Sequence, residues 1–187
     1  MSALLDVIMS VIVGGLIVIT IILTIGNIQE MNYNTSHMQD LKFLGNNLIE
    51  VLDAHFLESV GRNMGSDQTI LEATKSSFTF KSRQEPGSAD STVVISLEPT
   101  PDGFRLDIRQ DGVLMTHPNP SFLLESDEIF YFFDANKAET YDIDQIKGVQ
   151  VELKFVSKNF KNESGSLKYQ LSFVRFFRNV YINEMNI

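Results

Sequence analysis

The hydrophobic pattern begins with a long stretch that carries no charge. No residue from Val7 to Gln29 is charged, and at about 1.5 Å rise per residue a helix here reaches roughly 30 Å, enough to cross a bilayer core. A secretory signal peptide would open with Lys or Arg and carry a shorter apolar run. The pattern therefore predicts that residues 1–29 form a membrane-spanning helix.

After residue 30 the apolar positions recur every three or four residues, which is typical of a helix with one buried face. This stripe consists of Leu41, Leu44, Leu48, Leu52, Phe56 and Val60. Gly61 or Gly65 is a natural stop for the helix. We therefore expect residues 30–64 to continue the helix into a folded domain and to pack on a β-sheet.

From residue 65 onward the period changes toward two, which predicts strands. In Phe104–Arg109 apolar residues alternate with charged ones, as in a strand with one buried face. Asp111-Gly112 then offers a tight turn. Ile129–Phe133 is apolar on both faces and predicts a central strand. The predicted class is α+β, with a long N-terminal helix packed on an antiparallel sheet in residues 65–187.

The C-terminal part of the chain predicts an antiparallel hairpin that closes the sheet. Its two strands have matching alternations of apolar residues, at Val149, Val151, Leu153 and Phe155 and at Tyr169, Leu171 and Phe173. Gln84–Asp90 and Thr116–Ser121 are rich in turn-forming residues and predict loops.

Charge is unevenly distributed along the chain. The net charge is -9, yet from Lys147 onward there are 7 basic residues against 3 acidic ones. So acidic a chain has no overall bias toward nucleic acid, and no nucleic-acid partner is predicted. The basic end is either a solvated hairpin or a site for an anionic surface. Cysteine is absent, which excludes disulfides and thiolate chemistry.

Three residues interrupt the apolar helix. Asp6 precedes the longest apolar run, where its carboxylate either lies among lipid headgroups or pairs with the N-terminal ammonium of a neighbouring subunit. Gly14 and Gly15 either let a neighbouring helix approach closely or are ordinary membrane-helix glycines.

Residues that commonly carry chemistry do not form a recognisable catalytic set. His37, His55 and His117 lie far apart in the sequence. A nucleophile elbow, a phosphate-binding loop and a dinucleotide fingerprint are all missing. We therefore expect no enzyme activity and no cofactor, with one candidate exception.

The exception is an acidic run over residues 134–144, whose side-chain oxygens suit Ca²⁺. The candidate ligands are Asp134, Asn136, Asp142 and Asp144. The run departs from the EF-hand pattern at Ala138, Glu139 and Gln145. A turn capped by its own side chains is therefore favoured over a calcium site.

Several segments together resemble the type IV pilin-like superfamily, in particular minor pilins and type II secretion pseudopilins. The similar segments span nearly the whole chain: the apolar start with its acid at Asp6, Leu48–Gly61, Phe130–Asn136, Ile146–Leu153 and Phe173–Val180. In that family a glutamate at the fifth position of the processed chain helps to align the N-terminus of an incoming subunit. Asp6 is fifth in a chain that begins at Ser2.

The resemblance implies a structural subunit of a type IV pilus-like or pseudopilus-like cell-surface filament, assembled through Asp6, Gly14, Gly15 and the apolar helix. Its implied partners are copies of itself or related pilin-like subunits, inner-membrane assembly machinery and, before assembly, membrane lipid. The implied location is the cell membrane, crossed once, with the soluble domain outside the cytoplasm and at the cell surface after assembly.

A second hypothesis fits the same anchor: an extracytoplasmic binding or scaffold domain, held by one membrane helix, that forms no filament. The two hypotheses differ at Asp6, since its replacement impairs assembly only if filaments form.

Overall fold

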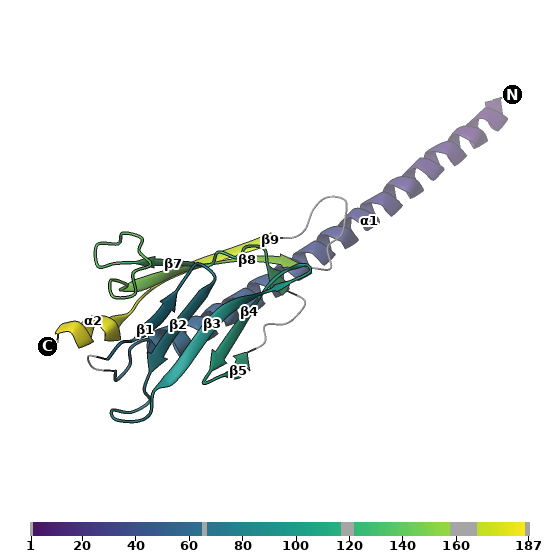
Figure 1. Ribbon diagram of the computed structural model, residues 1–187. Coiled ribbons are helices and arrows are strands. Elements are labelled where there is room, and N and C mark those ends of the chain that lie inside the picture. The colour runs from purple at the N-terminus through teal and green to yellow at the C-terminus, as the bar shows by residue number, and fades with distance from the viewer. Residues whose placement is uncertain (1, 65–66, 117–121, 158–167, 186–187) are drawn as a thin grey trace. The chain divides into compact units, whose positions relative to one another are not determined.

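The computed structural model describes residues 2–64, 67–116, 122–157 and 168–185, and its class is α+β (Figure 1). Helix α1 (Ser2–Glu50) continues as a π-helical segment η1 (Val51–Phe56) and a 3₁₀ turn η2 (Leu57–Ser59). The helical run stops at Gly61, whose φ of 71° lies in the left-handed region that glycine adopts without strain. The stop expected at this glycine is therefore confirmed.

The chain divides into two compact units, residues 1–40 and 41–187, and the division falls inside α1. The sequence pattern placed its boundaries after residues 29 and 64 instead. The structural division has a simple reason: Leu41 is the first residue of α1 that is fully buried. Residues 41–59 therefore form the first helical segment of the second unit. Below, "domain" means residues 41–187.

Among its described residues, the domain contains one antiparallel sheet of nine strands, in the order β1-β2-β3-β4-β6-β8-β7, with β5 beside β4 and β9 beside β8. The strands are β1 (Ile70–Ala73), β2 (Ser77–Ser82), β3 (Ser91–Thr100), β4 (Gly103–Gln110), β5 (Val113–Thr116), β6 (Phe122–Leu124), β7 (Phe130–Phe133), β8 (Gly148–Ser157) and β9 (Lys168–Phe176). A short helix, α2 (Arg178–Met185), follows β9.

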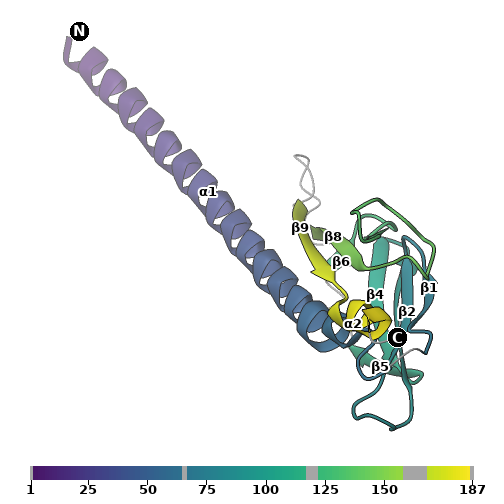
Figure 2. The same ribbon diagram turned by 90° about the vertical axis from the view of Figure 1, so that its left-hand side faces the viewer.

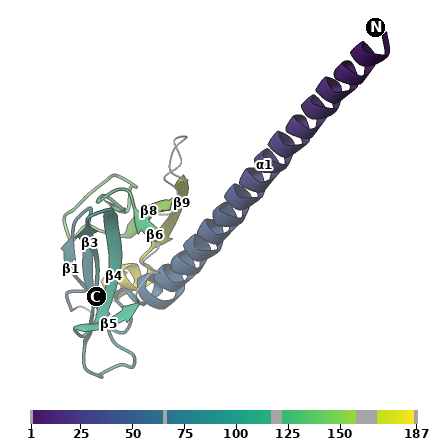
Figure 3. The same ribbon diagram turned by 90° about the vertical axis from the view of Figure 1, so that its right-hand side faces the viewer.

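The sheet bends between β4 and β6, where Phe104 and Leu124 form the one register pair among the described residues. Figure 1 shows the consequence: β7, β8 and β9 lie on one side of the domain and β1 to β5 on the other. Figure 3 shows β5 beside one end of β4. The last helical turns of residues 41–60 pack into the space that the bend encloses.

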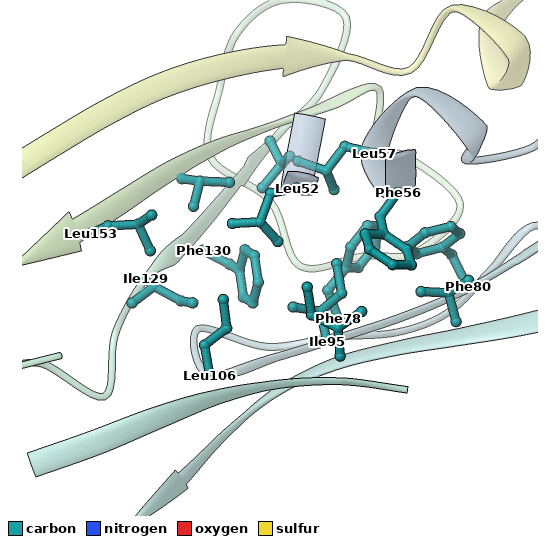
Figure 4. Packing of buried hydrophobic residues seen from close by; sticks show 14 of the residues in the cluster. Leu52, Phe56, Leu57, Phe78, Phe80, Ile95, Leu106, Ile129, Phe130 and Leu153 are labelled. Atoms are coloured by element: carbon teal, nitrogen blue, oxygen red, sulfur yellow. The ribbon is translucent and has the colours of Figure 1, made fainter. Parts of the chain in front are cut away.

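The core of the domain lies between these two parts of the sheet. Figure 4 shows Leu52, Phe56 and Leu57 from the helical segment against side chains of both parts, among them Phe78, Ile95, Phe130 and Leu153. Phe78 is central, with ring centroids 4.9 Å from Phe132 and 5.6 Å from Phe177. Aromatic contacts at this spacing stabilise beyond simple area burial.

Two sequence predictions about strands are confirmed. Asp111 and Gly112 connect β4 to β5 with φ values of 52° and 80°, as a two-residue hairpin turn with positive φ at both positions requires. The C-terminal hairpin has the expected register, with Val151 opposite Phe173 and Leu153 opposite Leu171.

Three features of the domain differ from expectation. β7 is not a central strand: among the described residues it pairs with β8 alone, apart from an isolated bridge between Phe133 and Glu139. Its outer aromatic residues, Tyr131 and Phe133, are half-buried, and Phe133 contacts the ring of Phe176. Asp107, expected on a solvated face of β4, is fully buried. Helix α2 was not anticipated.

Candidate functional site

The first unit presents apolar side chains on every side of its helix. Leu16 is 59% exposed and Ile17 is 55% exposed, and their neighbours are similar. The exposed apolar residues of this unit are Leu4, Leu5, Val7, Ile8, Met9, Val11, Ile12, Val13, Leu16, Ile17, Val18, Ile19, Ile21, Ile22, Leu23, Ile25, Ile28 and Met31. This helix is long and apolar enough to cross a membrane. A helix that is hydrophobic all round requires an apolar environment.

The three predicted assembly residues lie on this exposed helix. Asp6 is exposed, and a Cβ built on Gly14 or Gly15 would meet nothing within 4 Å. Within the unit, these glycines therefore have no packing role. Their backbone is open to a neighbouring helix, a close approach that residues with larger side chains prevent.

One face of the same helix carries hydroxyl groups that are already satisfied. The Oγ1 atoms of Thr20 and Thr24 donate to the carbonyl oxygens of Leu16 and Thr20, each at 2.8 Å. Together with Val13, Ile17 and other apolar residues, they border a shallow hollow of about 390 Å³. The hydroxyls thus add little polarity, and the face stays compatible with lipid or with another helix.

The predicted packing stripe lies in the domain and is mostly buried. Leu41, Leu48, Leu52, Phe56 and Val60 are buried, whereas Leu44 is half-buried. Gly45, which the sequence analysis did not single out, lies in the same interface. A Cβ there would come within 2.7 Å of Leu171 and 3.2 Å of Phe155, so this position brings the helix close to the β8–β9 hairpin.

The outer face of β7, β8 and β9 carries an aromatic groove that the sequence did not reveal. The rings of Phe133 and Phe176 meet edge to face with centroids 5.0 Å apart. Val174 and Tyr131 extend this apolar surface, and the groove has a volume of about 610 Å³. Charged and amide side chains complete its lining: Lys137, Glu139, Gln150 and Glu152.

Gly148 allows this aromatic surface to form. A Cβ at this position would lie 2.4 Å from the ring of Phe133 and 2.8 Å from the carbonyl oxygen of Arg175. The ring therefore rests on the bare backbone of β8. One feature of the sequence could have indicated this contact: a glycine, Gly148, at the start of a predicted strand, in a chain with an aromatic strand at Phe130–Phe133.

Two of the candidate calcium ligands, Asp134 and Asp142, use their carboxylates to accept hydrogen bonds from their own turns. Oδ1 of Asp134 accepts hydrogen bonds from the backbone N–H groups of Asn136 and Ala138, and Oδ1 of Asp142 accepts one from that of Asp144. In the part of the chain that the structure describes, no three acidic or histidine side chains gather to hold a metal ion. This geometry is a turn capped by its own side chains.

Asp107 is a buried carboxylate on β4, and two partly exposed arginine side chains lie against it. Its carboxylate lies 2.7 Å from Nε of Arg105 and 3.6 Å from Arg109. Burial alone would raise the pKa of Asp107, but the hydrogen bonds and positive charge of Arg105, supported by Arg109, hold that pKa below its usual range. These ion pairs stabilise the outer face of β4.

Arg175 joins the end of the helical segment to β9. Its guanidinium lies 3.2 Å from Asp53 and 3.3 Å from Glu58. Beside it, the amide of Asn179 donates to the carbonyl oxygens of Glu58 and Val60, each at 3.1 Å. Figure 2 shows α2 next to this helical end. These contacts fix the last helical turn, whose carbonyl groups lack partners within the helix.

The described residues thus offer two kinds of surface, an exposed apolar helix in the first unit and an aromatic groove on the domain. His37 contacts the ring of Tyr33 at 4.3 Å, while His117 and the side chain of His55 lie outside the described residues. No protein-family model, curated protein or solved structure matches this chain.

Proposed function

We propose that the chain is a structural subunit of a type IV pilus-like or pseudopilus-like cell-surface filament, and that it assembles through its apolar N-terminal helix. The observation that carries this proposal is the contrast inside α1. Apolar side chains are exposed on all sides from Leu4 to Ile28, whereas the stripe from Leu41 onward is buried in a folded domain. The N-terminal part of the helix thus needs an apolar environment, and its C-terminal part belongs to the core of the domain.

Energetics connect the exposed helix with assembly. Removing apolar surface from water is worth about 25 cal/mol per Å², so exposing this helix to water would be very unfavourable. Membrane lipid satisfies it before assembly. When the helix leaves the bilayer, only the helices of neighbouring subunits can cover it equally well, and the filament core supplies that cover.

Asp6, Gly14 and Gly15 are the proposed assembly residues. Gly14 and Gly15 let neighbouring helices approach closely. Asp6 pairs with the N-terminal ammonium of the adjacent subunit, and residues 1–41 contain no Lys or Arg that would compete with it. Such a pair is stable only with good geometry once it is removed from water, so it sets the register between subunits more than it adds affinity.

The proposal includes a location and a set of partners. Before assembly the chain crosses the cell membrane once, with residues 41–187 outside the cytoplasm. Inner-membrane assembly machinery then extracts it into a filament built of its own copies or related subunits. Tyr33, exposed and just beyond the apolar run, suits the membrane interface, where tyrosine is enriched.

Replacement of one carboxylate tests this function. Asp6→Ala is expected to leave the protein in the membrane fraction with a folded domain and to lower the yield of sheared surface filaments about tenfold or more. Asp40→Ala is the matched control, since Asp40 is an exposed acid on the same helix and should leave the filament yield unchanged. Equal yields from the two variants would remove Asp6 from the assembly mechanism.

The aromatic groove favours a second candidate function, a membrane-anchored binding domain that never forms filaments. A concave surface with rings in its floor and a few polar groups at its rim is typical of a ligand site. The two functions separate cleanly: Phe133→Ala abolishes activity of a binding domain, whereas filaments assembled through the N-terminal helix still form.

A further inference from the structure

Three arginine side chains surround one hollow at the end of the domain. The hollow has a volume of about 400 Å³ and is lined by Glu58, Arg62, Arg175, Phe176, Arg178, Asn179 and Ile182. We call it the arginine pocket. Elements that are distant in the sequence build it: the turn after η2, the end of β9 and the first turns of α2.

Only one of the three guanidinium groups is neutralised within the described part of the chain. Arg175 pairs with Asp53 and Glu58. Arg62 and Arg178 are exposed and have no ion-pair partner among the described residues. Like charges gathered around one hollow repel each other, and an anion placed between them removes that cost. Guanidinium groups bind carboxylates through paired hydrogen bonds.

The pocket is also firmly built. Arg175 is fixed by two carboxylates, and Asn179 is fixed by the carbonyl oxygens of Glu58 and Val60. A preformed site loses less conformational entropy when it binds. Arg62 and Arg178 therefore line the same hollow as two side chains that hydrogen bonds hold in place.

The same domain carries the complementary charge. Residues 125–146, here called the acidic segment, contain 7 acidic residues against 1 lysine. Asp127, Glu139 and Asp144 are exposed and have no ion-pair partner among the described residues. Asp134 and Asp142 cap turns, and Glu139 accepts a hydrogen bond from the hydroxyl of Tyr141. The carboxylates of Asp127 and Asp144 make no hydrogen bond among the described residues, and all three exposed acids can pair with a cation of another copy.

We propose that the arginine pocket of one copy binds carboxylates of the acidic segment of a second copy. Copies with a net charge of -9 repel when they gather, unless positive and negative surfaces are placed together. Since the pocket and the segment are different surfaces of one chain, the contact is heterologous and repeats from copy to copy. This inference rests on the proposed function, which places copies side by side.

Disulfide cross-linking tests the contact, because the native chain has no cysteine. One full-length copy carries Ile182→Cys at the pocket, and a second, differently tagged copy carries Ala135→Cys in the acidic segment. Co-expressed in cells, the two are expected to form a mixed disulfide. Val113→Cys on β5 paired with Ala135→Cys is the control and should give none.

Charge substitutions decide whether the arginines cause the contact. Arg62→Gln with Arg178→Gln is expected to lower the cross-link yield about tenfold, whereas the matched loss of two charges in Lys42→Gln with Lys154→Gln leaves it unchanged. Arg62→Glu with Arg178→Glu abolishes the cross-link, and Glu139→Lys with Asp144→Lys on the other copy restores it. Restoration by the second reversal shows that both variants still fold.

Electron microscopy of the same cells separates this inference from the proposed function. Filaments without the mixed disulfide overturn the arginine contact and leave the filament function standing. A cross-link without filaments supports the contact and overturns the filament function. If the arginine variants keep the cross-link but lose binding to vesicles containing anionic lipid, the pocket serves a membrane surface and the contact between copies is wrong.

Discussion

The two ends of the long N-terminal helical run differ in how their apolar residues are arranged and in what surrounds those residues. Leu16 is 59% exposed, whereas Leu52 is fully buried in the domain. The difference follows from arrangement: apolar residues surround the helix before residue 30, and they form one stripe after residue 40. A stripe packs on a sheet, while a helix that is apolar all round needs lipid or other helices. The comparison teaches that one continuous helical run can join a folded domain to a segment that needs an apolar environment of its own.

The largest effect expected from this comparison is a loss of domain stability when a buried leucine is truncated. Leu52→Ala is expected to lower the free energy of unfolding by about 3 to 5 kcal/mol, since it leaves a cavity in the core. Leu16→Ala should leave domain stability unchanged in detergent. Denaturant titration of the full chain, followed by near-ultraviolet circular dichroism, measures both. Equal losses would mean that the two halves do not differ as described.

The two kinds of glycine give the next contrast. Gly148→Ala is expected to cost about 1 to 3 kcal/mol of domain stability, because the new Cβ would overlap the ring of Phe133 and a backbone oxygen. Gly14→Ala meets no atom within 4 Å and should leave the domain unaffected while it weakens assembly. Domain unfolding and filament yield are the two measurements. A Gly14 variant with normal filaments would contradict the assembly role of that residue.

Acid should affect the domain through Asp107. Its pKa is lowered in the folded state, so the stability it contributes is present above the ordinary carboxyl pKa of about 4 and is lost as pH falls through the lowered folded value. Asp107→Asn is expected to cost about 1 to 2 kcal/mol at neutral pH and to flatten the acid limb of the stability profile. Asp40→Asn serves as the control. An unchanged acid limb in the Asp107 variant would assign that limb to other carboxylates.

The smallest effect is expected on the outer face of the sheet. Val174→Thr keeps the shape of a side chain that is 51% exposed, so domain stability should change by about 0.5 kcal/mol or less. The same unfolding titration measures it. A loss as large as that of Leu52→Ala would show that this face is covered when the domain folds.

The sequence predicts those features of the fold that depend on residues close together in the chain. The buried stripe, the Asp111-Gly112 turn and the β8–β9 register follow from spacing between near neighbours, and the structure has all three. The burial of Asp107 depends on arginines that fold over it. The edge position of β7 depends on its pairing with β8, a strand that follows much later in the chain. The spacing of apolar residues along the chain does not indicate either of these long-range contacts.

The candidate sites divide in the same way. The apolar helix with Asp6, Gly14 and Gly15 is visible in the sequence because it is one uninterrupted segment. The aromatic groove and the arginine pocket combine residues from elements far apart in the chain, such as Arg62 and Arg178, so only the fold brings them together. The acidic run is visible in the sequence, and within it the carboxylates of Asp134 and Asp142 accept hydrogen bonds from the backbone N–H groups of their own turns.

Electron cryomicroscopy of material sheared from the surface of cells that make this protein tests the central claim most directly. The account predicts helical filaments in which residues 3–29 of neighbouring subunits line the core and residues 41–187 form the outer surface. Cells that shed no such filaments, and keep every copy of the intact chain in the membrane fraction, would contradict it.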